Sequence, residues 1–234
     1  MVFTLRPPFF IEFMYYLLDD HISFPHPNAV KPSGILAISG DLSVERLLLA
    51  YNFGIFPWYN ESEPIIWWCP KPRFIIFPDQ VKVAKSIHSY FNKNKFQVTY
   101  NKHFEDIIRH CQYSPRNGQD GTWINDDIVN AYINLHTMGY ATSVEVWEEN
   151  ELIGGLYGVN IGKVFFGESM FSLKSNASRF GFISLARKLA SEGYYIIDCQ
   201  QPNPYLESLG GQFISGVDFQ DILRLNRKEC MVKE

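Results

Sequence analysis

Glu168, Asp198 and Gln200 are the residues of this 234-residue sequence whose types and positions could together do chemistry. Glu168 follows one apolar run, and Asp198 and Gln200 follow a second run at 194–197. A helix is expected between the two runs, so that both acids lie at strand ends. A carboxylate at an apolar pocket can orient and deprotonate an incoming amine, whose free pKa is roughly 8.

The side-chain period of two in a strand predicts that Asp198 and Gln200 share one face and that Cys199 lies on the other. This argues against Cys199 as their partner. Without a side-chain nucleophile, the three polar groups suit direct transfer between two bound substrates. The alternative for Asp198 is a structural aspartate that caps a turn at the strand end.

Other catalytic machinery is not recognisable in the sequence. The four cysteines are scattered and form no C-x-x-C pair, which speaks against a zinc site and a disulfide framework. Motifs for P-loops, dinucleotide-binding loops, zinc proteases and nucleophile elbows are absent. A loop for the pyrophosphate of acyl-coenzyme A is also missing near 176–183, so coenzyme A is a poor donor candidate.

Periodicity and turn residues predict an α+β sheet with its loops at one end. A helix that Asn176 or Ser178 caps is expected to end at Gly193. Glycines 154, 155 and 158 indicate a bulge or the close approach of a substrate to the backbone. The further strands are expected at 34–40, 73–77, 96–100, 141–147, 152–159 and 163–167, and the further helices at 44–52, 78–91, 104–111, 126–138 and 217–225.

The composition is that of a globular chain, with 46% hydrophobic residues and no apolar run long enough to span a membrane. The apolar N-terminal stretch 9–18 contains Glu12 and precedes no small-residue cleavage site, so we expect no secretory signal and a cytoplasmic protein. The length favours one domain with a smaller one beside it.

Charge is unevenly distributed over the chain. Segment 71–116 holds nine basic and three acidic residues, a net charge of +6. Since the formal net charge of the whole chain is −4, the remaining residues carry −10. Such a segment fits a local footprint for a polyanion, and a solvated basic surface is an equal alternative.

Tryptophans and prolines crowd the stretch 54–72. Trp58, Trp67 and Trp68 could form a small core, or a platform on which a nucleobase stacks. Trp123, at the exit of a polar loop, could belong to the core or to a site.

A set of short runs in this order resembles the leucyl/phenylalanyl-tRNA–protein transferase family. The combination of GESMFS at 167–172 with IDCQ at 197–200 is the most specific part. The other matching runs are SGDLS at 39–43, AYNFGIFPWY at 50–59, PIIWWCPKPR at 64–73, GTWI at 121–124, SVEVW at 143–147, GGLYGV at 154–159, NAS at 176–178 and SLGG at 208–211.

This resemblance implies an α+β fold: a GNAT-like acyltransferase domain at 67–234, with a mixed sheet and flanking helices, after a small N-terminal α/β domain at 1–66. It implies an enzyme that moves Leu or Phe, and also Met, from the 3′ end of aminoacyl-tRNA to proteins that begin with Arg or Lys. The peptide bond formed creates an N-terminal degradation signal. The resemblance implies no metal or other cofactor, no membrane and a monomer.

By the same resemblance, Asp198 is the acid/base or amine-positioning group, Gln200 relays or orients, and Glu168 holds the substrate amine. Trp58 and Trp123 match positions near the terminal adenosine. Lys85, Lys93 and Lys95 are expected to contact the tRNA. The expected pocket for the aminoacyl group contains Leu156, Phe165, Met170, Phe182, Leu185, Ile197 and Asn203.

Two other functions stay open from the residues alone. The first is an acyl-CoA-dependent acetyltransferase, which the missing pyrophosphate loop disfavours. The second is a non-catalytic RNA-binding module that uses the tryptophans and the basic segment.

Overall fold

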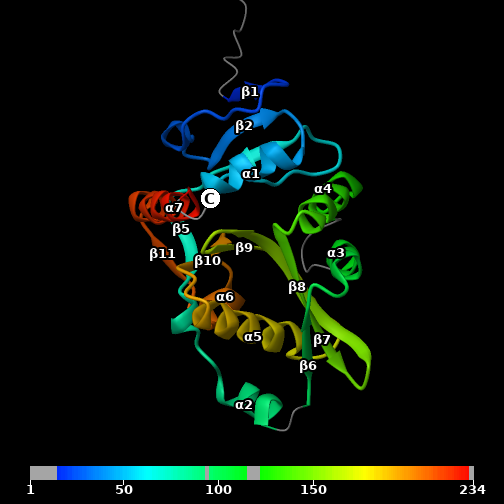
Figure 1. Ribbon diagram of the computed structural model, residues 1–234. Coiled ribbons are helices and arrows are strands. Elements are labelled where there is room, and N and C mark those ends of the chain that lie inside the picture. Colours follow the sequence, from blue (N-terminus) through cyan, green and yellow to red (C-terminus); the bar gives the residue numbers. More distant parts are fainter. Residues whose placement is uncertain (1–14, 93–94, 115–121, 232–234) are drawn as a thin grey trace, which may run out of the picture.

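The computed structural model describes residues 15–92, 95–114 and 122–231, in which two sheets lie one above the other (Figure 1). The upper sheet has the order β1-β2-β4-β3 and the lower one β11-β5-β10-β9-β8-β7-β6. The upper strands are β1 (Tyr16–Leu18), β2 (Ile35–Ser39), β3 (Phe56–Pro57) and β4 (Ile66–Trp68). The lower strands are β5 (Arg73–Ile76), β6 (Gln97–Tyr100), β7 (Ala141–Glu148), β8 (Glu151–Ile161), β9 (Val164–Ser172), β10 (Ile196–Gln200) and β11 (Gln212–Ile214).

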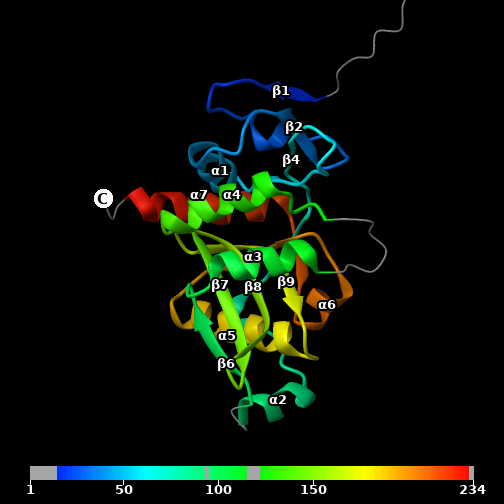
Figure 2. The same cartoon turned by 90° about the vertical axis from the view of Figure 1, so that its right-hand side faces the viewer.

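Helices cover both faces of the lower sheet (Figures 1 and 2). α5 packs on β7 and β8 from one side, and α3 and α4 pack from the other, so each face has its own hydrophobic core. The core under α3 and α4 continues into α1 and the upper sheet. The helices are α1 (Val44–Asn52), α2 (Lys85–Asn92), α3 (Phe104–Tyr113), α4 (Asp126–Thr137), α5 (Ala177–Ser191), α6 (Pro204–Ser208) and α7 (Gly216–Met231), with 3-10 turns at Pro27–Ala29 and Pro78–Gln80.

The unit β9-α5-β10 positions the polar residues identified from the sequence. β9 pairs antiparallel with β8, and after α5 the chain returns as β10, parallel to β9. β10 also pairs antiparallel with β5, with a register shift between Asp198 and Gln200. A parallel pair brings equivalent strand ends to one edge of a sheet, so Glu168 on β9 and Gln200 on β10 become neighbours.

Several sequence predictions are confirmed. Helix 44–52 has the predicted bounds, because the Ser43 hydroxyl accepts from the Arg46 N–H at its start and Gly54 has φ +73° just after its end. The meander 141–167 is present as β7, β8 and β9, and Gly193 takes the predicted left-handed conformation, φ +72°.

The predicted helix at 78–91 is wrong in its first half. Pro78 opens a 3-10 turn, and α2 begins only at Lys85. Between them the Lys82 N–H donates to the Leu209 carbonyl at 2.9 Å, which holds this stretch in an extended path. The strand expected at 163–167 is too short, since β9 continues to Ser172 through the polar residues. Helix α6 and strand β11 were not predicted.

Gly158 takes part in a bulge, as predicted, but its environment leaves no room for a substrate. The β8–β9 register shifts between Tyr157 and Gly158. A Cβ at Gly158 would lie 2.2 Å from the Phe166 carbonyl oxygen and 2.4 Å from the Phe165 ring. Any side chain at position 158 would therefore collide with neighbouring protein atoms, so this position requires glycine.

Asn176 occupies the N-cap position of α5 without capping it. Its backbone is left-handed, φ +67°, and its side chain makes no cap hydrogen bond. The Ser178 N–H donates instead to the Ser172 hydroxyl on β9, at 3.1 Å. The start of α5 is thus tied to the strand before it.

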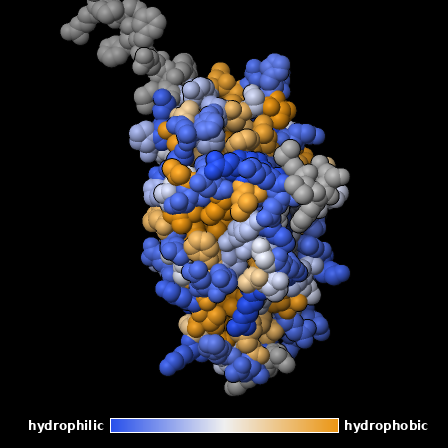
Figure 3. All heavy atoms as spheres, turned by 60° about the vertical axis from the view of Figure 1, so that its left-hand side comes forward, coloured by the Kyte–Doolittle hydropathy of each residue, from blue (hydrophilic) through white to orange (hydrophobic). Residues whose placement is uncertain are grey.

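The expected fold class is confirmed: the chain is α+β, with a mixed sheet, flanking helices and a smaller N-terminal sheet. The predicted domain boundary at 66/67 falls inside β4 and stays a prediction. On the face in Figure 3, apolar patches lie between polar side chains. Within the described ranges, no helix is long and apolar enough to cross a membrane.

Candidate active site

A cavity of about 1080 Å³ lies where β8, β9 and β10 meet α5, the segment 201–206 and β3 with the following Trp58. Its size is typical of small-molecule sites. The cavity brings together most of the side chains predicted from the sequence. They are Trp58, Trp123, Leu156, Phe165, Glu168, Met170, Phe182, Ile197, Gln200 and Asn203.

Glu168 is the charged residue in the described wall of this cavity. Gln200 donates through Nε2 to Glu168 Oε1 at 3.0 Å. Tyr51 donates to Glu168 Oε1 at 2.7 Å, and Tyr132 donates to Oε2 at 3.2 Å. The two tyrosine hydroxyls also lie within hydrogen-bond distance of each other, and their two protons are shared among these three contacts. Three donors from three elements therefore fix the carboxylate.

Sequence reasoning missed Tyr51 and Tyr132. Both are fully buried, on α1 and α4, and look in the sequence like ordinary core positions of amphipathic helices. Burial, together with the charge of Glu168, raises both phenol pKa values well above 10. The phenols therefore stay protonated donors at neutral pH.

Burial raises the pKa of Glu168 to about 7, and the charge of Asp198 adds to the effect. The hydrogen bonds from Tyr51, Tyr132 and Gln200 oppose this rise because they stabilise the ionised form. A carboxyl with this pKa exchanges its proton near neutral pH. Glu168 is thus suited to accept a proton from an amine.

Asp198 lies behind the cavity wall rather than in it, and none of its surface is exposed. Its carboxylate accepts from Arg73, through Nε to Oδ1 at 2.8 Å and Nη2 to Oδ2 at 2.7 Å. The Gln200 N–H also donates to Oδ1, at 2.9 Å. Arg73 is buried as well.

The predicted alternation along β10 is wrong at this point. Gln200 is left-handed, φ +63°, and the register shift precedes it. As a result Cys199 and Gln200 both line the cavity, and Asp198 does not. Burial raises the pKa of the Cys199 thiol well above 9, so it stays neutral and is a poor nucleophile.

Four of the predicted pocket residues form a buried apolar wall: Leu156, Phe165, Phe182 and Ile197. Met170 lies beside them and is partly exposed. Leu185 is buried in the core below and does not line the cavity. This wall can hold an apolar side chain through burial of its surface.

The tryptophans separate into core and site positions. Trp67 is fully buried, and its Nε1 donates to the Ser39 carbonyl at 2.9 Å. Trp58 and Trp123 line the cavity, and Trp68 supports Trp58 at a ring distance of 5.4 Å. The core hypothesis is therefore confirmed for Trp67, and stacking of a nucleobase on Trp58 stays a prediction.

Asn203 and the predicted lysines lie around the site. Asn203 lines the cavity while its side-chain oxygen caps α6, accepting from the Leu206 N–H at 2.8 Å. Helix α2, whose exposed first residue is Lys85, lies at the end of the molecule farther from the upper sheet (Figures 1 and 2). Lys95 is exposed too and lies in the chain between α2 and β6. Lys95 pairs with Glu148 at 3.6 Å. Lys93 lies outside the described residues.

The net charge of segment 71–116 overstates its accessible basic surface. Arg73 is buried against Asp198, and Arg109 pairs with Asp126 at 2.6 Å. Arg116 lies outside the described residues. The positive charge left for a polyanion is therefore mainly that of exposed lysines.

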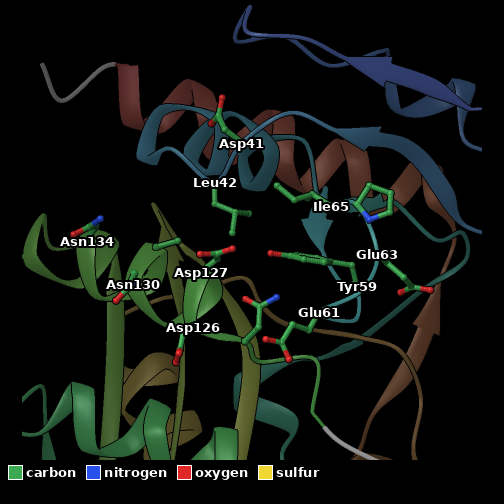
Figure 4. Close-up of a pocket in the computed structure, with 13 residues that line it drawn as sticks. Asp41, Leu42, Tyr59, Glu61, Glu63, Ile65, Asp126, Asp127, Asn130 and Asn134 are labelled. Carbon is green, nitrogen blue, oxygen red and sulfur yellow. The ribbon is translucent and has the colours of Figure 1, made fainter.

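A second cavity, of about 610 Å³, lies between the upper sheet and α4 (Figure 4). Acidic and amide side chains dominate its described lining, including Asp41, Glu61, Glu63, Asp126 and Asp127. Such a lining repels phosphate groups. In the described ranges, no three His, Cys, Asp or Glu side chains are grouped as a metal site requires.

The sequence matches a known family over most of its length. The model of the leucyl/phenylalanyl-tRNA protein transferase family matches residues 75–224, and the model of its N-terminal domain matches 40–71. A leucyl/phenylalanyl-tRNA–protein transferase of Flavobacterium johnsoniae is 51% identical over 90% of this chain and 99% of the relative. One of Pseudomonas fluorescens strain SBW25 is 49% identical over 89% and 93%.

The solved structures that the chain matches are much more distant in sequence. L-PGS from Bacillus licheniformis has a TM-score of 0.41 and 13% identity, over 74% of this chain and 55% of that chain. A GCN5-related N-acetyltransferase from Kribbella flavida has a TM-score of 0.36 and 7% identity, over 70% and 58%.

Proposed function

Because this chain belongs to the leucyl/phenylalanyl-tRNA–protein transferase family, we propose that its cavity joins leucine or phenylalanine from aminoacyl-tRNA to the N-terminal amine of a protein. The chain is thus an aminoacyltransferase. The observation that carries the site assignment is the pairing of Glu168 and Gln200 at the edge of an apolar cavity. Methionine is a further donor, since its side chain is also apolar and uncharged.

In this reaction the neutral amine attacks the ester carbonyl of the aminoacyl-tRNA. The C–N bond forms, and the bond from the carbonyl carbon to the terminal ribose oxygen breaks. Glu168 takes the proton that the amine loses and returns it to the departing ribose oxygen, which leaves as a hydroxyl of the free tRNA. The Gln200 carboxamide is close enough to orient the amine beside Glu168.

The two substrates divide the cavity between them. The apolar wall of Leu156, Phe165 and Phe182 takes the aminoacyl side chain, which loses contact with water there. Trp58 and Trp123 stack on the terminal adenosine, since an aromatic ring binds a base through its π face. The acceptor amine enters beside Glu168.

The acceptor and its fate follow from the family resemblance. We assign proteins that begin with Arg or Lys as acceptors, and a degradation signal as the product. The enzyme acts in the cytoplasm, where aminoacyl-tRNA is made, and works as a monomer. It needs no metal or dissociable cofactor, because the ester of aminoacyl-tRNA is already activated for attack by an amine.

The decisive experiment follows labelled leucine from Leu-tRNA to a peptide that begins with Arg. Wild-type protein is expected to label this peptide and to leave an N-acetylated copy unlabelled, since the acetylated amine cannot attack. Tight binding of uncharged tRNA without transfer would contradict the enzyme and favour the RNA-binding module. Acetylation of the peptide from acetyl-CoA would favour the acetyltransferase.

Binding of tRNA is expected to weaken as the salt concentration rises. Exposed lysines such as Lys85 and Lys95 contact phosphates, and each contact releases counterions. Raising salt from 50 to 200 mM should weaken binding roughly tenfold, and the variant Lys85→Ala, Lys95→Ala should flatten this slope. Filter binding measures both.

The control for this experiment is Lys228→Ala, which removes an exposed lysine from α7, a helix that lies away from α2 (Figure 1). It should leave the slope unchanged. A wild-type affinity that does not vary with salt would contradict phosphate-based binding.

A further inference from the structure

The ion pair of Arg73 and Asp198 is costly to bury, because both charges lose their contact with water. Both side chains are almost completely buried, and Arg73 Nη1 has no hydrogen-bond partner among the described residues. Replacing a buried ion pair by apolar side chains of similar volume is often neutral or stabilising. Stability alone therefore does not explain why the sequence keeps a charged pair directly behind the cavity wall.

The surroundings of Arg73 hold its guanidinium in one plane. The ring of Phe56 on β3 lies 4.9 Å from the guanidinium carbon, and the ring of Phe219 on α7 lies 4.8 Å from it. Such stacking, together with two parallel hydrogen bonds to Asp198, leaves the guanidinium little freedom. Asp198 is consequently held in place by Arg73, the first residue of β5.

What Asp198 holds in turn is the backbone of Gln200. The left-handed conformation of Gln200 is unfavourable for a residue with a side chain. The hydrogen bond from the Gln200 N–H to Asp198 Oδ1 offsets this cost. The same conformation directs the Gln200 carboxamide to Glu168.

We propose that Arg73 is a positioning residue of the transfer reaction, which through Asp198 keeps Gln200 in the conformation that faces Glu168. Asp198 is a positioning residue too, and it receives no proton from the substrate. Its Oδ1 accepts two hydrogen bonds, its Oδ2 accepts one, and neither reaches the cavity. This inference rests on the proposed function.

The test compares substitutions that keep or remove each link. Arg73→Lys keeps the positive charge but cannot make the two parallel hydrogen bonds to Asp198. Its kcat should therefore fall about tenfold while its KM for Leu-tRNA stays unchanged. Asp198→Asn keeps an oxygen for the Gln200 N–H, so its kcat should exceed that of Asp198→Ala about tenfold. The Asn variant acts as the conservative rescue.

Hydrogen exchange of the Gln200 amide gives a second readout that does not depend on activity. Exchange should be slow in wild type and in Asp198→Asn, and faster by at least tenfold in Asp198→Ala and Arg73→Lys. The control is Arg46→Lys, a change at another buried arginine, on α1, which bonds to Asp41. It should leave exchange of the Gln200 amide as in wild type.

Three results would overturn the proposal. One is Arg73→Lys with the kcat and the Gln200 exchange of wild type. The second is Asp198→Asn as inactive as Asp198→Ala, which would make Asp198 the proton acceptor. The third is a fall in kcat of Arg46→Lys as large as that of Arg73→Lys. Lack of transfer by wild type would instead contradict the proposed function, and amide exchange would still decide whether Arg73 holds Gln200.

Discussion

Replacement of Glu168 by glutamine is expected to lower kcat for leucine transfer by about a hundredfold or more, with KM for Leu-tRNA nearly unchanged. Gln keeps the size of the side chain and can still accept from Tyr51 and Gln200, but it cannot take a proton. Since no other acid lies in the described wall of the cavity, nothing replaces it. Single-turnover transfer of labelled leucine measures the loss directly.

The pH dependence of wild type provides an independent measure of the same group. Because the pKa of Glu168 is about 7, kcat/KM should rise as the pH increases through about 7 and the carboxyl ionises. Tyr51→Phe removes a hydrogen bond that lowers this pKa, so the rise should move to higher pH. An unchanged midpoint in Tyr51→Phe, with Glu168→Gln active at the wild-type rate, would contradict Glu168 as the base.

Stability should change in the opposite sense to activity. The pKa of Glu168 in the folded state lies above the ordinary value of 4.5, so the folded state binds its proton more tightly than the unfolded state does. Folding is therefore favoured at low pH, and this contribution is lost as the pH rises from about 4.5 to about 7. At pH 8 the free energy of unfolding of Glu168→Gln should exceed that of wild type by roughly 1–3 kcal/mol, and at pH 5 the two should differ little. Denaturant unfolding at the two pH values measures this difference.

The sequence was sufficient for the elements that depend on local signals. Helix α1 was predicted with its observed bounds because a serine cap, an apolar repeat and a glycine define it within a dozen residues. The neighbourhood of Glu168 and Gln200 was also predictable, since a strand-helix-strand unit brings two strand ends together.

The interior of the site was not predictable, and Asp198 shows why. A strand pattern alternates only where the strand is regular, and the register shift before Gln200 moved Cys199 into the cavity wall and left Asp198 out of it. The partner of Asp198 is Arg73, which the sequence placed in a basic surface segment. Tyr51 and Tyr132 reach Glu168 from helices that only tertiary packing brings together.

The apolar wall leads to the second large effect: kcat/KM for transfer from Lys-tRNA should be at least about a thousandfold below that from Leu-tRNA. A buried ammonium without a partner costs several kcal/mol, and each 1.4 kcal/mol is a factor of ten. Leu156, Phe165, Phe182 and Ile197 offer it no hydrogen-bond acceptor on their side chains.

Met-tRNA is the matched control for this comparison, because methionine also has a long unbranched side chain but no charge. If charge decides, Met-tRNA should react within about tenfold of Leu-tRNA, since a hydrophobic pocket discriminates weakly between apolar side chains of similar size. If Met-tRNA were rejected as strongly as Lys-tRNA, shape rather than desolvation would set the specificity. Equal transfer from Lys-tRNA and Leu-tRNA would show that the aminoacyl side chain does not bind against this wall at all.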